Sequence, residues 1–345
     1  MKLTHLFAIA LFVLIGLPLA LFITAAAQNP QDTKQAGSEY RLSGPYTHEN
    51  LTVFLVHGKD QTTKTFLTLQ EALAQKKVKV YETKNVNELA IRNFSHQDVY
   101  VQAGDMVRGG EQDRMISVDF IVPPRSGRMP IAAYCVESGR WSRRGNEAPA
   151  TFSSSENSVT SKELKLAAKS AKSQDAVWQN VSLAQEKLGR TVGGSVQDGA
   201  SASSLELSVE SSKVKESTAD YIGALFGILS KHNDVIGYVF AINGQVNSAD
   251  IYASRALFAK LWPKLIKATS VEAIAELRKD VEMKPVTNET IIGFLAESEQ
   301  PAAATKDVTR RVKLVTKEDD KTAFFETQDR DQKDGWVHRN YIKKQ

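Results

Sequence analysis

Two short polar stretches of the chain carry residue types from which a charged pocket could be built. The stretch GGEQDR covers residues 109–114, and ESGRW covers residues 137–141. Carboxylates such as those of Glu111 and Glu137 can serve as general acid and base. Arginine guanidinium groups match the geometry of phosphate and carboxylate ligands, and a tryptophan ring offers a surface for stacking. Together these residue types predict a site for an anionic ligand.

A β-hairpin would bring the two stretches together. Alternating residues predict a strand over 112–122, with Gln112 and Arg114 on the same side as its apolar residues. A second strand is predicted over 131–137, and the short connection PPRSGRMP favours a direct hairpin turn. Arg114 would then lie opposite residues 137–139, with opposed Cβ atoms about 5 Å apart. Six side chains would converge at the open end: Glu111, Gln112, Arg114, Glu137, Arg140 and Trp141.

The predicted pocket has two interpretations. In the first, the protein is an enzyme in which Glu137 or Glu111 acts as general acid or base. In the second, it is a non-catalytic exported binding or structural module, in which the same cleft binds a ligand or partner and the arginine–glutamate pair holds the cleft open. A pair between Arg114 and Glu137 could also be purely structural and close the edge of the core. In both, the conformational freedom of glycine lets the backbone approach a ligand closely. The residues predicted to hold the ligand are Gly110, Gln112, Arg114, Arg140 and Trp141.

The first 27 residues predict transport across a membrane. An almost unbroken apolar run at 6–23 follows Lys2, and three alanines at 25–27 provide the small residues of a cleavage site. This pattern is typical of a secretory signal peptide. The run is also long enough to span a bilayer, so an uncleaved anchor over 6–27 is the alternative. We expect the rest of the chain to be secreted or periplasmic, and to meet the membrane only through this segment.

The composition limits the classes of partner and cofactor. The net charge is only +4, and no dense basic stripe alternates with aromatic residues. We therefore expect no nucleic-acid partner. The His and Cys residues do not have the spacing of a zinc site, so we predict no metal site, and the cofactor stays unknown. The single cysteine, Cys135, lies in an apolar run and is predicted to be a buried hydrophobic residue.

The order of the predicted elements favours an α+β fold. Strand-like segments occur in runs and helical patterns form a separate block. We expect a largely antiparallel sheet core, a packed block of helices and a short C-terminal β meander, which could stand alone or extend the main sheet. Asn243-Gly244, between two apolar runs, predicts a hairpin turn. The predicted segments are a flexible spacer at 28–45, a main domain at 46–295, and a linker with the meander at 296–345.

Several of these segments resemble a known domain family. The stretches AGDMVRGGEQDRMISVDFIVPP, IAAYCVESGRW, QDAVWQNV and IGYVFAINGQVNSADIYASRALFAKLWPKLIKA are similar to the ARG and Rhodanese-Phosphatase-superfamily-associated Protein domain, over about residues 46–280. The matched positions are Gly104, Gly110, Gln112, Arg114, Cys135, Glu137, Gly139, Arg140 and Trp141. Because the family is named for its association with ADP-ribosylglycohydrolases, the resemblance implies a setting in NAD-derived nucleotide metabolism. It thereby implies an ADP-ribose-like ligand, which the protein would bind or act on.

Overall fold

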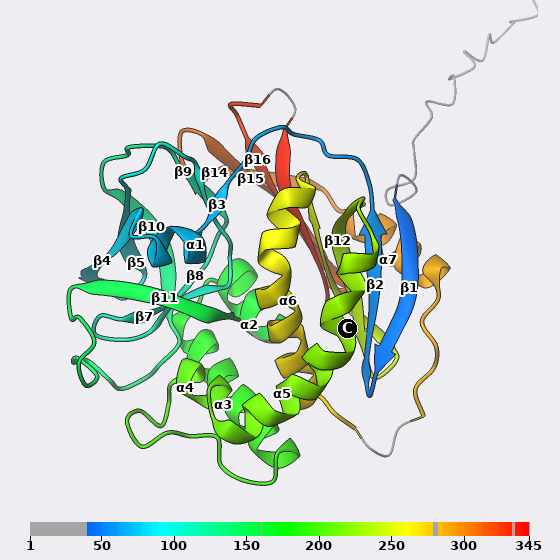
Figure 1. The fold of residues 1–345 in the computed structure, drawn as a ribbon, viewed down its shortest axis with the longest axis horizontal. Coiled ribbons are helices and arrows are strands. Elements are labelled where there is room, and N and C mark those ends of the chain that lie inside the picture. Colours follow the sequence, from blue (N-terminus) through cyan, green and yellow to red (C-terminus); the bar gives the residue numbers. More distant parts are fainter. Residues whose placement is uncertain (1–39, 160, 279–281, 333–334, 345) are drawn as a thin grey trace, which may run out of the picture. The chain divides into compact units, whose positions relative to one another are not determined.

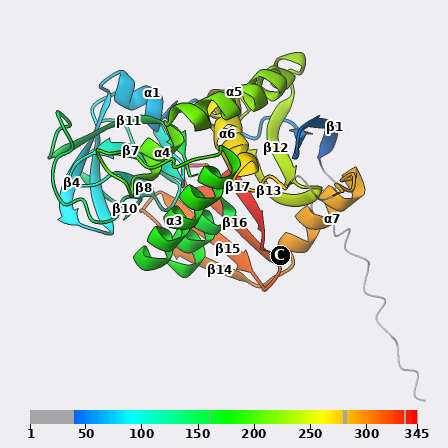
Figure 2. The same ribbon diagram turned by 90° about the horizontal axis from the view of Figure 1, so that it is seen from below.

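Two antiparallel β-layers dominate the computed structural model, which describes residues 40–159, 161–278, 282–332 and 335–344. One layer is an eight-stranded sheet and the other is a closed six-stranded barrel. Figures 1 and 2 show the barrel strands on one side of the molecule and the eight-stranded sheet on the other. This arrangement, with its helices and C-terminal strands, confirms the predicted α+β class. The predicted leader at 1–27 lies outside the described residues.

The eight-stranded sheet combines the beginning, the middle and the end of the described chain. Its order is β1-β2-β12-β13-β17-β16-β15-β14, and every neighbouring pair is antiparallel. The strands are β1 (Arg41–His48), β2 (Leu51–His57), β12 (Val235–Ile242), β13 (Gln245–Tyr252), β14 (Ala303–Asp307), β15 (Val312–Glu318), β16 (Thr322–Asp329) and β17 (Trp336–Lys343). The tail strands therefore form a meander that extends the main sheet, because β17 pairs with β13.

The β12–β13 turn and the start of β1 test two predictions made from the sequence. The hairpin between β12 and β13 turns at Asn243 and Gly244, whose φ angles of 52° and 74° are both positive, as the predicted tight turn requires. The predicted spacer at 28–45 ends too late, because β1 already begins at Arg41. Pairing with β2 gives this polar segment a hydrogen-bonding partner that its composition does not reveal.

The closed barrel has the order β10-β5-β4-β11-β7-β8. Its strands are β4 (Val78–Asn85), β5 (Glu88–Asn93), β7 (Asp105–Gly109), β8 (Arg114–Ile116), β10 (Met129–Cys135) and β11 (Thr151–Ser158). A small sheet lies beside it, with β6 (Val99–Val101) between β3 (Leu67–Thr68) and β9 (Phe120–Val122). Barrel closure leaves no free strand edge, so all six strands can bury their inner faces.

The predicted continuous strand over 112–122 is wrong. Strand β8 ends at Ile116, and β9 begins at Phe120 in a different sheet. At the break, the buried Asp119 carboxylate accepts a hydrogen bond from the backbone N–H of Ala103 at 2.7 Å. This side chain thus takes the place of a strand carbonyl as the partner of that N–H. The predicted antiparallel pairing of the two segments does occur, but Arg114 lies opposite Cys135 rather than residues 137–139.

The helices cover the sheet on both faces. The elements are α1 (Leu69–Ala74), α2 (Lys162–Leu166), the π-helix η1 (Ala167–Ala171), α3 (Gln174–Thr191), α4 (Leu205–Val209), α5 (Ser212–Leu225), the 3-10 helix η2 (Phe226–Lys231), α6 (Arg255–Ala275) and α7 (Asn288–Ser298). Side chains of β12 alternate between two hydrophobic clusters, Tyr238 and Phe240 in one and Val239 in the other. The first cluster includes α6 and the second includes α7, so the two helices pack on opposite faces.

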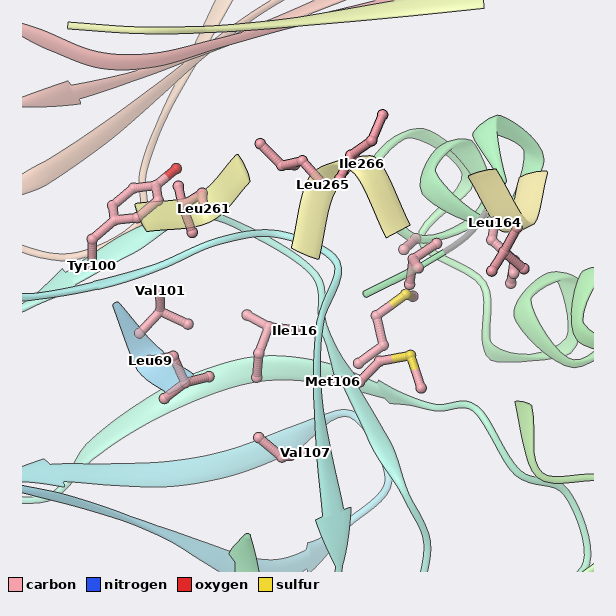
Figure 3. Close-up of a cluster of buried hydrophobic side chains, with 14 of the residues drawn as sticks. Leu69, Tyr100, Val101, Met106, Val107, Ile116, Leu164, Leu261, Leu265 and Ile266 are labelled. Atoms are coloured by element: carbon pink, nitrogen blue, oxygen red, sulfur yellow. The ribbon is translucent and has the colours of Figure 1, made fainter. Parts of the chain in front are cut away.

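Helix α6 joins the sheet to the barrel. It contacts β12 and β13 on one side and β11 on the other, and Figure 1 shows it between the two layers. Figure 3 shows Leu261 and Leu265 of α6 in one cluster with Val101, Met106 and Ile116. Within the described residues, no helix is both long enough and apolar enough to span a bilayer.

Candidate functional site

Arg114 does not take the partner predicted from the sequence. Its Nη2 lies 3.3 Å from both carboxylate oxygens of Glu82, and its Nη1 donates to the carbonyl of Val86 at 2.6 Å. Strands β4 and β8 are not neighbours in the barrel, so this buried pair links two strands that share no backbone pairing. The predicted pair of Arg114 with Glu137 is therefore wrong. The preceding residue, Asp113, contacts Glu137 instead, through its backbone N–H.

Glu137 is the acceptor at the centre of a second buried cluster. Arg140 donates to it from Nε and Nη2, each at 2.6 Å, and the backbone N–H of Asp113 donates at 2.9 Å. Burial by itself would raise the pKa of Glu137, but the hydrogen bonds from Arg140, Ser201 and Asp113 outweigh it and lower that pKa. A fully buried carboxylate held in the ionised form is a weak base and a poor proton donor near neutral pH.

Arg144 completes this cluster and was missed by sequence reasoning. Its guanidinium donates to both oxygens of Asp113, at 2.9 and 3.1 Å, and to Glu147 at 2.8 Å. Burial raises the pKa of Asp113, the Arg144 hydrogen bonds oppose that rise, and nearby Glu137 adds to it. The sequence offers no signal that separates Arg144 from its exposed neighbour Arg143, because only the fold decides which of them turns inward.

The other predicted ligand-binding residues do not converge on one open surface. Gln112 is completely buried, and neither its side-chain oxygen nor its nitrogen has a hydrogen-bond partner among the described residues. Trp141, by contrast, is 52% exposed, and Glu111 is half-buried. Gly110 has a φ of 56°, and a Cβ there would lie 2.5 Å from the Phe152 ring. This glycine is therefore required for packing.

The guanidinium of Arg140 already donates its hydrogen bonds to groups of the protein itself. Besides its two bonds to Glu137, it donates from Nη1 to the carbonyls of Ser142 at 2.6 Å and Gly110 at 3.4 Å. A ligand anion would have to displace these acceptors. The geometry of this cluster therefore favours the second interpretation, in which charged residues stabilise the end of the barrel.

A different polar network lies between the barrel and the eight-stranded sheet. His338 of β17 is buried, with Nδ1 2.7 Å from Asp119 and Nε2 3.0 Å from Asp250. Its ring stacks on Tyr252, with centroids 4.4 Å apart. Burial would lower the pKa of His338, but the two carboxylates outweigh burial and raise it. The pKa values of Asp119 and Asp250 are lowered, since their own burial is outweighed chiefly by interactions with His338.

A small cavity adjoins this network. Its volume is about 20 Å³, room for about one water molecule, and its polar lining includes Asp250, His338, Asn340 and Glu272. Burial raises the pKa of Glu272 to about 7, although Lys165 opposes the rise. One oxygen of Asp250, Oδ2, has no hydrogen-bond partner among the described residues, which fits a cavity occupied by water.

A larger pocket of about 230 Å³ shares Ser117, Ala168 and Lys169 with the small cavity. We call it the lysine pocket, because Lys169, Lys172 and Lys306 line it. Its remaining lining residues are Val118, Asp119, Phe120, Pro130, Ile131, Ala132, Tyr134, Asp307, Val308, Thr309, Leu314, Phe325 and Thr327. They come from the β8–β10 region, the π-helix η1 with its C-cap, and the C-terminal meander. The sequence contains no local motif that links these segments.

Unusual backbone geometry places two of the lysines at this pocket. Lys169 lies in the π-helix η1, and Lys172 caps it in the left-handed region, with a φ of 51°. Both features are uncommon for non-glycine residues and recur at functional sites. The ammonium of Lys169 donates to Asn340 Oδ1 at 2.7 Å and lies 4.1 Å from the Phe325 ring centroid. We therefore take the lysine pocket as the candidate site.

Metal binding finds no support in the described part of the chain. No group of three or more His, Cys, Asp or Glu side chains is arranged there to hold a metal ion. Cys135 is buried and its thiol lies near the Val86 carbonyl. Burial raises the pKa of Cys135 to about 11, although nearby Arg114 opposes the rise. This thiol therefore stays protonated near neutral pH and is a poor nucleophile.

One comparison with known proteins gives a match. The model of a domain family described as ARG and Rhodanese-Phosphatase-superfamily-associated Protein domain matches residues 39–342. No curated protein and no solved structure matches the chain. The match confirms the predicted family and extends beyond residues 46–280. It includes His338 and Asn340 of strand β17, and so every residue of the lysine pocket and of the His338 network falls within it.

Replacement of Arg144 by Met should strongly destabilise the protein. The change removes the nearer of two cations from the buried Asp113 carboxylate and leaves only Arg140, at 3.7 Å; breaking a buried pair costs about 3–5 kcal/mol. Arg143→Met is the matched control, because that neighbouring side chain is exposed and its replacement should alter stability by less than about 0.5 kcal/mol. Urea unfolding measures both. Equal stabilities of the two variants would show that the Asp113 cluster is not structural.

The stabilisation from His338 should depend on pH. Its pKa is raised in the folded state, so its contribution is complete below the unfolded value of about 6.5 and is lost as the pH rises through the folded value. The lowered pKa values of Asp119 and Asp250 add a contribution present above about pH 4 and lost as the pH falls further. The network should therefore stabilise the fold most between about pH 4 and 6.5.

Comparison of wild type with His338→Gln tests this expectation. The difference in unfolding free energy between them should be largest near about pH 5.5 and should shrink as the pH rises to about 8. His96→Gln is the control, because this exposed histidine lies away from the network. A difference between wild type and His338→Gln that stays constant over this range would contradict a charged His338.

Proposed function

Since the chain belongs to the ARG and Rhodanese-Phosphatase-superfamily-associated Protein domain family, we propose that it binds a small anionic ligand in the lysine pocket. The family name, through its ADP-ribosylglycohydrolase association, favours an ADP-ribose-like compound. The pocket chemistry suits any ligand that joins a phosphate or carboxylate group to a less polar body.

The observation that carries this proposal is the charge balance of the pocket. Its two carboxylates are each paired with a cation outside the lysine set: Asp119 with His338, and Asp307 with Arg330. Within the described residues, no ion pair links Lys172 or Lys306 to a carboxylate. Both lysines are exposed, so a bound anion would gain two ammonium partners without breaking an existing ion pair.

The rest of the lining suits the other part of such a ligand. Phe120, Ile131 and Leu314 provide apolar surface, and the hydroxyl groups of Ser117 and Thr309 provide hydrogen-bonding partners. Binding pockets commonly combine a mainly apolar wall with a few placed polar groups. The ligand would therefore be oriented with its anionic group toward Lys172 and Lys306.

A second location for the ligand is the cluster predicted from the sequence. Trp141 is exposed and follows Arg140 directly, so its ring could stack on a ligand at the surface. In that alternative Glu137 or Glu111 would be the acid or base, with Gly110, Gln112 and Arg114 behind them. Glu137 and Arg140 already hydrogen-bond to each other, and Arg140 also donates to a backbone carbonyl, so the lysine pocket is the better candidate.

Ligand binding should raise the melting temperature of the protein, and loss of the pocket lysines should remove the effect. A compound present at 100 times its dissociation constant stabilises the folded state by about 2.7 kcal/mol. We expect a shift with ADP-ribose, ribose 5-phosphate or a related anion. Because charge-assisted hydrogen bonds contribute about 1.5–3 kcal/mol, Lys172→Met and Lys306→Met should each weaken binding about tenfold or more.

Two control variants separate the possible locations. Lys79→Met removes an exposed lysine on strand β4, which does not line the pocket, and should leave binding unchanged. Trp141→Ala should also leave binding unchanged if the ligand occupies the lysine pocket. Loss of binding in Trp141→Ala, with binding retained in the Lys172 and Lys306 variants, would transfer the site to the Glu137 cluster. No shift with any phosphate or carboxylate compound would refute the proposal.

We also propose that residues 1–27 direct export of the chain, a proposal that rests on their sequence pattern alone. Expression of the full chain in a bacterium, followed by N-terminal sequencing of the exported product, should give a new terminus close to the alanines at 25–27. Leu14→Arg, which places a charge within the apolar run, should retain the protein inside the cell. An intact leader in the membrane fraction would instead support the anchor over residues 6–27.

A further inference from the structure

We infer that Lys169 is a nucleophile in the lysine pocket, and that it condenses with an aldehyde or ketone group of the bound anion to form an imine. This inference rests on the proposed function and names its substrate class. The ligands would be small anionic carbonyl compounds, including sugar phosphates whose ring opens to an aldehyde.

The position of Lys169 sets it apart from the other two lysines of the pocket. Lys172 and Lys306 are exposed, whereas Lys169 is half-buried and lines both the lysine pocket and the small cavity. An anionic group held by Lys172 and Lys306 would therefore leave the body of the ligand directed toward Lys169. The three lysines divide into two that bind charge and one at the inner end of the pocket.

The surroundings of Lys169 hold its amine in a defined place. Asn340 donates from Nδ2 to Asp250 at 2.9 Å, which turns its Oδ1 toward the amine of Lys169. The Phe325 ring lies on another side, at 4.1 Å from the amine nitrogen to the ring centroid. Among the residues that the structure describes, this nitrogen contacts one polar acceptor and one aromatic ring, and it forms no ion pair with a carboxylate.

The amine also has a larger neutral fraction than an ordinary lysine. Burial lowers the pKa of Lys169 to about 8, and Lys165 contributes in the same direction, whereas Asp119 and Asp250 oppose the shift. A larger share of such an amine is neutral at pH 7 than of an ordinary lysine, whose pKa is about 10.4. Desolvated lysines of this kind are the ones that attack carbonyl substrates.

The chemical step balances without any further reactant. The nitrogen lone pair attacks the carbonyl carbon, a C–N bond forms, and the π electrons of the carbonyl move to its oxygen. One amine proton passes to that oxygen, giving a carbinolamine. Loss of the hydroxyl group together with the second amine proton releases one water molecule and forms the C=N bond. Hydrolysis reverses the sequence and regenerates the free lysine.

Reductive trapping tests this inference on the intact protein. The chain is incubated at pH 7 with ribose 5-phosphate or glyoxylate in the presence of cyanoborohydride, and the modified lysines are located by peptide mass mapping. We expect Lys169 to be modified at least tenfold faster than Lys79. Lys79 is a suitable reference because it also lies over an aromatic ring, that of Tyr81, but is exposed.

Two further comparisons define the site. Lys169→Arg keeps a cation beside Asn340 and Phe325 and should abolish the fast adduct. Propionaldehyde, a neutral aldehyde, should modify Lys169 at least tenfold more slowly than glyoxylate does. Because the ratio between Lys169 and Lys79 is measured within wild-type protein, the test does not depend on whether the variant folds.

The outcomes distinguish this inference from the proposed function. A melting shift with ribose 5-phosphate, but trapping at Lys169 no faster than at Lys79, would overturn the inference and leave anion binding intact. Neither a shift nor trapping would overturn both. Equal rates for propionaldehyde and glyoxylate would show that Lys169 is reactive but does not select anions, and would overturn the assigned substrate class.

Discussion

The contact of His338 with Asp119 and Asp250 joins parts of the protein that are far apart in the chain. Asp119 lies between β8 and β9, Asp250 lies in β13, and His338 lies in β17. Asp119 belongs to neither strand, and its carboxylate accepts a hydrogen bond from Ala103 where the chain passes from the barrel to the small sheet. Asp119 also lines the lysine pocket, whereas Asp250 and His338 line the small cavity beside it.

Buried charges in this protein are stabilised by several partners at once. Removing a charge from water costs several kcal/mol, and a single ion pair rarely offsets that cost. Asp119 accordingly accepts from Ala103 and Thr327 as well as contacting His338. Asp113 likewise accepts from Arg144, Ser204 and a backbone N–H. Among the residues that the structure describes, no ion pair is formed by Lys172 or Lys306 of the lysine pocket, and this contrast is why we propose that they bind a ligand.

Local sequence patterns predicted much of the fold but failed where side chains replaced backbone partners. The β12–β13 hairpin was predictable because Asn243-Gly244 suits one turn type regardless of its surroundings. The strand over 112–122 was not, because its apolar alternation continues past Ile116 although Asp119 ends the pairing. Arg114 begins β8 and Glu137 follows the end of the neighbouring strand β10, yet their side chains contact different partners.

The sequence by itself determined the α+β class, the family and the presence of polar residues around two neighbouring segments, since these depend on composition, periodicity and local motifs. Only the tertiary structure decided which charges are neutralised. Lys169, Lys306 and His338 belong to segments that are far apart in the sequence, and no local pattern relates them. Their chemistry depends on burial and on the distances to Asp119, Asn340 and Phe325, which exist only after the barrel and the sheet have packed together.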